Sequence, residues 1–267
     1  MADARPIGIF DSGLGGLSLV RALLNLLPRE NVLYVGDTAH LPYGNKSLAE
    51  VQQFSLDITH FLLEQRAKAI AVACNTATAA AVNLLRKTWP EIPIVGMEPA
   101  VKPAAQATQS GVVGVLATQA TFRSPRYADL TERYGKEVTV LEDPCRGLVE
   151  LIEQGRANAP ETEARLREIL RPMQEAGADT YVLGCTHYPF AEPTIRRITG
   201  PNVCIINPAP AVARQLEHRL RTLDRLNGLG PGGRHRFLTT GSASAMQALV
   251  RSHLHLSATV EEIALST

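Results

Sequence analysis

Two segments of this chain share one pattern, in which an apolar run ends in a cysteine that is followed at once by polar side chains. Cys74 stands in AVACNTATA and Cys185 in YVLGCTHYPF. Each run is typical of a buried strand, so each thiol is predicted to lie in the loop at the carboxyl end of a strand, where open α/β sheets carry their chemistry. The repeated strand-to-thiol pattern therefore favours a duplicated α/β architecture.

Short β-branched runs alternate with helical patterns along the chain, which is typical of βα units around a parallel sheet. The expected strands are 7–10, 32–35, 69–73, 93–96, 112–116, 138–141, 180–183, 203–206 and 235–238. This is too many for one simple three-layer unit. An internal duplication explains the excess, because IGIFDSGLGG and VGVLATQAT are both strand-to-loop turns, and Asp11 precedes Cys74 by about as many residues as Thr118 precedes Cys185.

The sequence predicts two similar open-sheet α/β domains related by internal duplication. Residues 1–98 and 209–267 would form the first, discontinuous domain, and residues 99–208 the second. The crossovers are placed near Pro99 in GMEPAVKPA and Pro208 in INPAPAVA, because proline disfavours regular structure there. Ligand sites favour domain interfaces, so the active site is expected in the interdomain cleft, with the two thiols facing each other.

Composition excludes several classes of function. The 27 basic and 26 acidic residues leave a net charge of +1, so nucleic acid is not expected as a primary ligand. The four cysteines form no Cys-x-x-Cys pair, which argues against a zinc ribbon, and a length of 267 residues argues against a disulfide scaffold. The chain shows neither a secretory signal nor an apolar run of about 20 residues, so a cytoplasmic protein without a membrane partner is expected.

Two thiols in matching settings suit acid–base chemistry on one small substrate. Removing a proton from the carbon next to a carboxylate needs a base on one face, and inverting that carbon needs an acid on the other, roles that two cysteines can exchange. Asp11 is the candidate assistant of Cys74, and His187 that of Cys185. A structural alternative stays open for each: Asp11 as the N-cap of the following helix, and His187 as a residue bonded to its own turn.

Other residues in the strand-end loops divide into structural and binding candidates. Cys145 in EDPCRGL and Cys204 in an apolar run lack the repeated setting and are expected to be structural, as many free cysteines are. The hydroxyls and amides that could hold an amino-acid substrate are Ser12, Asn75, Thr76, Thr118, Thr121 and Thr186. The GLGG run does not have the spacing of a nucleotide loop. The segment DTAHLPYG has a turn-forming order, with a plain surface turn as its alternative.

The motifs IGIFDSGLGGLSLV, YVGDTAHLPYG, VACNTATA, GMEPAVKPA and LGCTHYPF occur in this order. Together they resemble the glutamate racemases of the cofactor-independent aspartate/glutamate racemase superfamily, over about residues 6–207. The resemblance implies interconversion of L- and D-glutamate without pyridoxal phosphate, another cofactor or a metal. It also implies a supply of D-glutamate for peptidoglycan synthesis, hence for cell-wall biogenesis and cell shape, and a homodimeric assembly.

The resemblance also implies a role for individual residues. Cys74 would take the proton from the D-isomer and Cys185 from the L-isomer, and Asp11 and His187 fall at the thiol-assisting positions. The positions that match glutamate-binding residues are Ser12, Pro42, Tyr43, Gly44, Asn75, Thr76, Thr121 and Thr186, with Thr118 in addition. Asp37 and Glu150, the latter in GLVELIE, would be further acidic positions around the site. Asn207 in INPAP and the order PCRGLVE depart from the family pattern.

Three other functions stay open at this point. The nearest is an aspartate or broad-specificity amino-acid racemase with the same two-thiol chemistry, which differs in the length of its pocket. A second is a binding or regulatory protein on the same scaffold, such as one acting on a gyrase, although the near-neutral charge offers that role no support. A third is a one-thiol hydrolase or isomerase, in which the second cysteine would be dispensable.

Overall fold

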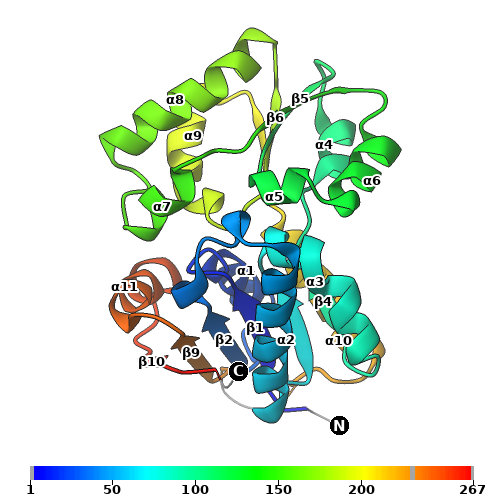
Figure 1. The fold of residues 1–267 in the computed structure, drawn as a ribbon, viewed down its shortest axis with the longest axis vertical. Coiled ribbons are helices and arrows are strands. Elements are labelled where there is room, and N and C mark those ends of the chain that lie inside the picture. Colours follow the sequence, from blue (N-terminus) through cyan, green and yellow to red (C-terminus); the bar gives the residue numbers. More distant parts are fainter. Residues whose placement is uncertain (1–2, 229–231, 266–267) are drawn as a thin grey trace. The chain divides into compact units, whose positions relative to one another are not determined.

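The structure is a computed structural model, and it describes residues 3–228 and 232–265. The chain divides into two compact units, which are described one at a time (Figure 1). Unit 1 consists of Met1–Met97 and Ala209–Thr267, and unit 2 consists of Glu98–Pro208. The chain therefore leaves unit 1 once and returns to it once. That 1–98 with 209–267, and 99–208, fold as separate domains stays a prediction.

Unit 1 contains a six-stranded parallel sheet in the order β10-β9-β2-β1-β3-β4. Its strands are β1 (Ile7–Asp11), β2 (Val32–Gly36), β3 (Ala69–Val72), β4 (Ile94–Gly96), β9 (His235–Thr239) and β10 (Val260–Glu262). All residues of β1, β2 and β3 are buried. Strands that are covered on both faces read as continuous apolar runs, which is why these segments stand out in the sequence.

Helices cover both faces of the unit 1 sheet (Figure 1). They are α1 (Leu17–Leu26), α2 (Leu48–Glu64), α3 (Asn75–Thr88), α10 (Ala209–Thr222) and α11 (Ala243–Leu254), with short 3₁₀ turns at η1 (Thr38–His40) and η2 (Tyr43–Asn45). Helices α2 and α3 pack on each other, whereas α1 packs on α10 and α11. Helix α2 begins at a capping box, in which Ser47 and Glu50 satisfy each other's backbone N–H groups.

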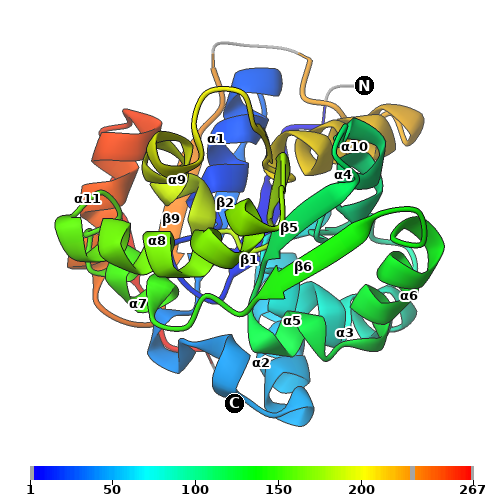
Figure 2. The ribbon, with the colours of Figure 1, turned by 90° about the horizontal axis from the view of Figure 1, so that it is seen from above.

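Unit 2 contains a four-stranded parallel sheet in the order β6-β5-β7-β8. Its strands are β5 (Val112–Leu116), β6 (Thr139–Asp143), β7 (Thr180–Leu183) and β8 (Cys204–Ile206). Its helices are α4 (Val101–Ala107), α5 (Gln119–Phe122), α6 (Pro125–Tyr134), α7 (Leu148–Glu153), α8 (Pro160–Glu175) and α9 (Glu192–Thr199), with a 3₁₀ turn at η3 (Tyr188–Ala191). Figure 2 shows β5 and β6 between α7, α8 and α9 on one side and α4 and α6 on the other.

The two sheets repeat one topology, so the fold class expected from the sequence is confirmed. The order β6-β5-β7-β8 in unit 2 matches β2-β1-β3-β4 in unit 1. In this order the second strand along the chain lies on one side of the first and the third lies on the other, which creates a switch point at the carboxyl ends of the first and third strands. Strands β3 and β7 occupy equivalent places, and Cys74 and Cys185 follow them.

Two details differ from the expectations. Strand β10 was not expected, because VEE is a short, mostly exposed edge strand without an apolar pattern. Cys204 is exposed rather than part of a core, because β8 is the edge strand of its sheet. Within residues 3–228 and 232–265, no helix combines the length and the apolar character that a membrane crossing requires.

Asp179 connects the entry points of β5 and β7. Its carboxylate accepts hydrogen bonds from Thr108 Oγ1 at 2.6 Å and from the backbone N–H groups of Gln109 and Ser110, each at 2.8 Å. Partial burial raises the pKa of Asp179, but these bonds, together with one from Thr180, outweigh it and lower the pKa to about 2. The carboxylate therefore stabilises the folded state above its unfolded pKa of 3.8.

We expect this stabilisation to disappear as the pH falls from about 4 to about 2, where the folded protein also protonates Asp179. The gain is at most about 1 kcal/mol, because the group is only partly buried and solvent screens it. Urea unfolding of the wild type and of Asp179→Asn across this pH range checks it. The free energy of unfolding of the wild type should exceed that of the variant by less and less as the pH falls. A difference that stays constant with pH would contradict the assignment.

Candidate active site

The unit 1 half-site comprises the loops that follow β1, β2 and β3. Strand β1 pairs with β2 on one side and with β3 on the other, in register and parallel. Their carboxyl ends therefore meet at one edge of the sheet. This edge carries Asp11 and Ser12 after β1, the segment 37–45 after β2, and Cys74 after β3.

Cys74 is the N-cap of α3 and contacts Ser12. Its sulfur accepts a hydrogen bond from the backbone N–H of Ala77 at 3.4 Å, and its thiol lies 3.6 Å from Ser12 Oγ. The side chain is almost fully buried, at 5% exposed. The positive end of the helix dipole and the Ala77 N–H both favour a negative sulfur, so this position stabilises a thiolate.

Asp11 is buried and supports the loop in front of α1. Its Oδ2 accepts hydrogen bonds from the backbone N–H groups of Gly13 at 3.2 Å and Gly16 at 3.0 Å. A Cβ atom at Gly16 would lie 2.7 Å from the Asp11 Cβ, so this close approach requires glycine. Asp11 thus supports the loop that leads into α1, and because the N-cap of this helix is Gly16, the N-cap alternative for Asp11 is wrong. Its assistance to Cys74 stays a prediction.

Asn75 presents an unsatisfied amide beside Cys74. It is 4% exposed, and neither its Oδ1 nor its Nδ2 has a hydrogen-bond partner among the described residues. Thr76, the next residue of α3, is also buried, at 6% exposed. A buried amide without partners costs free energy unless a ligand or water satisfies it. This residue is therefore available to bind a polar ligand.

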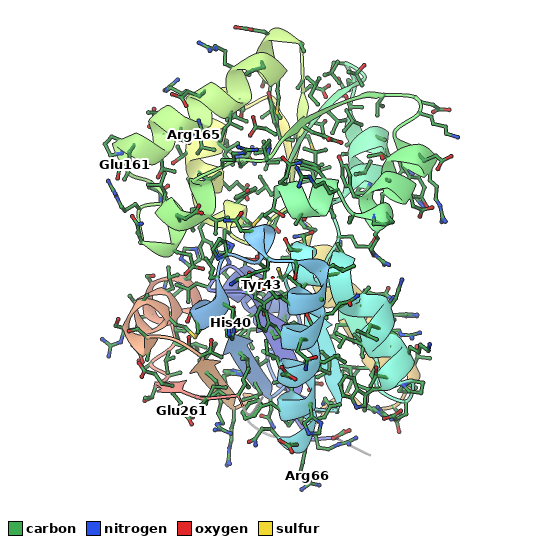
Figure 3. All side chains as sticks on the ribbon, in the orientation of Figure 1. His40, Tyr43, Arg66, Glu161, Arg165 and Glu261 are labelled. Carbon is green, nitrogen blue, oxygen red and sulfur yellow. The ribbon has the colours of Figure 1, made fainter. Side chains whose placement is uncertain are left out.

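The segment after β2 is organised by the fully buried carboxylate of Asp37. The Tyr43 hydroxyl donates to Asp37 Oδ2 at 2.6 Å, and His40 Nδ1 lies 2.9 Å from both carboxylate oxygens. Burial, followed by the charge of Asp37, raises the pKa of Tyr43 far above its ordinary value, so its phenol stays protonated. Figure 3 labels His40 and Tyr43 in this segment. Pro42 and Gly44, on either side of Tyr43, are partly exposed. Because Tyr43 and Asp37 are buried, the segment is not the plain surface turn of the alternative interpretation.

In unit 2, Cys185 lies beside a hydrogen-bonded pair formed by His187 and Glu153. His187 Nδ1 lies 3.6 Å from the Cys185 sulfur, and His187 Nε2 lies 2.5 Å from Glu153 Oε1. Burial lowers the pKa of His187, but the hydrogen bonds and charges of Cys185 and Glu153 outweigh it and raise that pKa well above its ordinary value. These groups thus favour the protonated imidazole, which lies directly beside the Cys185 sulfur.

Glu153 is the functional candidate that sequence reasoning missed. It is the last residue of α7, whereas Glu150, the acidic residue singled out from the sequence, is exposed one turn earlier. Residues three apart on a helix can share a face, so the sequence alone did not separate the two glutamates. Glu153 reaches His187 from a different element, so the pattern LVELIE alone carried no signal that singled it out.

The hydroxyl candidates of unit 2 lie on two neighbouring loops. Thr118 caps α5, and its Oγ1 lies 3.0 Å from Thr121 Oγ1. Thr121 and Thr186 are buried, at 1% and 3% exposed, and Thr118 is partly exposed. Because β5 and β7 are paired, the loops that carry Thr118 and Thr186 leave the same sheet edge.

Cys145 follows β6 and faces the protein interior. Its thiol is 2% exposed, and burial, followed by the charge of Asp143, raises the pKa of Cys145 well above its ordinary value. A neutral buried thiol fits the structural role expected for it. All four cysteines lie in the described part of the chain, and each is a free thiol. Within this part, no group of three or more histidine, cysteine, aspartate or glutamate side chains is placed to hold a metal ion.

The fold and the two candidate loop clusters define a class: an α/β protein with a buried thiol after the third strand of each repeat. A family model described as Asp/Glu/Hydantoin racemase matches residues 7–216. The chain therefore belongs to the Asp/Glu/hydantoin racemase family.

Within this family, the chain is similar to glutamate racemases. It is 49% identical over 245 residues to the glutamate racemase of Ectopseudomonas mendocina (strain ymp), covering 92% of this chain and 93% of the relative. The crystal structure of the Francisella tularensis glutamate racemase with D-glutamate has a TM-score of 0.85 at 32% identity and covers 99% of both chains. That of the Escherichia coli glutamate racemase with L-glutamate and the activator UDP-MurNAc-ala has a TM-score of 0.84 at 29% identity, covering 98% of this chain and 100% of the other.

Proposed function

We propose that this protein is a glutamate racemase that interconverts L- and D-glutamate by two-base proton transfer at Cα, with Cys74 and Cys185 as the bases. The observation that carries the proposal is that both thiols follow equivalent strands of a duplicated sheet, each with a stabiliser for its thiolate. For Cys74 the stabiliser is the N-terminus of α3, and for Cys185 it is the His187 imidazolium.

The proposed reaction balances without an external oxidant, reductant or proton donor. From L-glutamate, the Cys185 thiolate takes the Cα proton and becomes a thiol, while the Cys74 thiol gives its proton to the opposite face of Cα and becomes a thiolate. From D-glutamate the two cysteines exchange roles, as the resemblance implies. The pKa of each thiol must lie near the working pH for both roles to be efficient.

The remaining polar side chains would bind the substrate. The proposed binding residues are Ser12, Pro42, Tyr43, Gly44, Asn75, Thr76, Thr118, Thr121 and Thr186. The amide of Asn75, which has no hydrogen-bond partner in the described part of the chain, supports this assignment most directly. Hydroxyl and amide groups can hold the ammonium and carboxylates of an amino acid without burying a further charged side chain. No cofactor or metal takes part in the proposed reaction.

The proposal extends to the setting of the enzyme. Its D-glutamate would supply peptidoglycan synthesis, and so cell-wall biogenesis and cell shape. We propose a cytoplasmic homodimer. The relatives named above support the chemistry of this proposal, and the assembly rests on the resemblance.

Incubation of the purified protein in deuterated water, separately with L-glutamate and with L-aspartate and without an added cofactor, tests the proposal. Optical rotation and Cα deuterium are followed together. Loss of rotation with deuterium uptake on glutamate alone is the expected result. The same result on aspartate would move the assignment to an aspartate or broad-specificity racemase, and no exchange on either substrate by folded, reduced protein would overturn it.

Glu153→Gln is expected to lower kcat/KM about tenfold, because it removes the charge that helps to keep His187 protonated. The fall of activity at alkaline pH should also begin at a lower pH, since a His187 without its carboxylate loses its proton earlier. Glu150→Gln is the matched control, because Glu150 lies on the same helix and is exposed. Equal effects of the two variants would contradict the role given to Glu153.

A further inference from the structure

The tip of β9 adjoins the segment that carries Tyr43, although it lies outside the residues matched by the family model. Strand β9 pairs with β2 so that Thr239 lies opposite Gly36. The next residue, Thr240, donates its backbone N–H to the Gly36 carbonyl at 3.1 Å. Thr240 therefore lies beside the start of the segment 37–45.

The Thr240 hydroxyl makes two hydrogen bonds to this segment. It donates to Asp37 Oδ1 at 2.7 Å and accepts from the backbone N–H of Ala39 at 3.1 Å. The other carboxylate oxygen, Asp37 Oδ2, accepts the Tyr43 hydroxyl at 2.6 Å. A fully buried carboxylate needs such donors, because an ionised group that lacks them carries a large desolvation cost. The contacts thus form one continuous path from Thr240 through Asp37 to Tyr43.

Tyr43 is fixed by this path on one side and by packing on the other. Its ring is 1% exposed, and its centroid lies 5.7 Å from that of Phe54 on α2. The stacked ring of His40, 4.1 Å from Phe54, joins the same cluster and contacts Asp37. Removing a donor to Asp37 therefore loosens the hydrogen-bonded side of Tyr43 while the aromatic packing remains.

From these contacts we infer that Thr240 is a positioning residue for substrate binding, which acts through Asp37 on Pro42, Tyr43 and Gly44. The inference rests on the proposed function, in which these three residues bind glutamate. The hydrogen bonds of the Thr240 hydroxyl go to Asp37 and Ala39 rather than to a thiol, so its role concerns the affinity for substrate rather than the proton transfer. An interaction that contributes equally to ground-state and transition-state binding changes KM and leaves kcat unchanged.

Three variants of Thr240 test the inference. Thr240→Val keeps the shape of the side chain but lacks the hydroxyl. Thr240→Ala lacks both the hydroxyl and the methyl group, and Thr240→Ser keeps the hydroxyl. Thr239→Val is the comparison variant, because Thr239 ends the same strand and its hydroxyl bonds to Thr38 Oγ1 of the same segment at 2.7 Å and accepts from the Gly241 N–H at 3.3 Å, but does not bond to Asp37. The measurements are steady-state kinetics with L- and D-glutamate and hydrogen–deuterium exchange of the amides in residues 37–46.

Thr240→Val and Thr240→Ala are expected to raise KM about tenfold for both isomers, with kcat within about twofold of the wild type, as the loss of one charge-assisted hydrogen bond suggests. Exchange of the 37–46 amides should become faster. Thr240→Ser should restore both properties, and Thr239→Val should leave KM within about twofold. An unchanged KM in Thr240→Val, a failed rescue by serine, or an equal rise in Thr239→Val would overturn the inference.

The exchange measurement separates this inference from the proposed function. If the wild-type protein racemises no glutamate, the proposed function fails on its own account. In that case, faster exchange of residues 37–46 in Thr240→Val, with rescue by serine, still supports the positioning role. Unchanged exchange overturns that role whatever the substrate proves to be.

Discussion

Cys185→Ser is expected to lower kcat/KM for glutamate racemisation by at least about 10³-fold, within the range that a single general acid–base group contributes. A serine hydroxyl is a much weaker acid than a thiol, so it supplies no usable base at neutral pH. The enantiomers have equal free energies in water, so kcat/KM must fall by the same factor in both directions. A polarimetric assay with each isomer measures the loss, and Cys74→Ser should show a loss of the same order.

The residual Cα exchange in deuterated water distinguishes the two variants. Cys185→Ser retains Cys74, so its remaining deuterium uptake should favour D-glutamate, whereas Cys74→Ser should favour L-glutamate. Cys204→Ser is the control, because this thiol is exposed on the edge strand β8 and should be silent. If either active-site variant kept normal turnover, or if both favoured the same isomer, the two-base assignment would be wrong.

The fold was predictable from sequence because its strands are buried on both faces. Runs such as 69–73 and 180–183 are mostly apolar and buried throughout, and the loops that end them carry the two cysteines. Strand β10 was not predictable in this way, because two of its three residues are exposed and its place in the sheet depends on pairing with β9. Edge strands leave a weaker sequence pattern than central ones.

The candidate site was predictable where its residues lie close together in the sequence or follow neighbouring strands, as Ser12 and Cys74 do. Cys185 and His187 are two residues apart, and their contact follows from one loop. Glu153 reaches His187 from a different element, and Thr240 reaches Asp37 across a strand pairing. Such contacts depend on the register of the sheet and on how helices pack, which local patterns do not specify.

Lys68→Met is expected to destabilise the protein by about 3–5 kcal/mol, because it leaves a buried carboxylate without its cation. Lys68 is 0% exposed, and its Nζ lies 2.6 Å from Glu30 Oε2 and donates to the Asp3 carbonyl at 2.6 Å. The other oxygen of Glu30 accepts the backbone N–H of Asn227 at 2.7 Å. The pair thus connects the residues before β2 and β3 with the N-terminal segment and with the chain after α10.

The double variant Lys68→Met/Glu30→Gln should recover much of this loss, because a neutral amide costs far less to bury than an unpaired carboxylate. Arg236→Met is the matched control from the same unit, since the Arg236–Glu261 pair is about half exposed and should contribute less than about 1 kcal/mol. Urea unfolding of all four proteins gives the comparison. If Lys68→Met lost no more stability than Arg236→Met, the buried Lys68–Glu30 pair would not stabilise the segments that it connects. The amino end of the sheet would then be held by its strand pairing and apolar core alone.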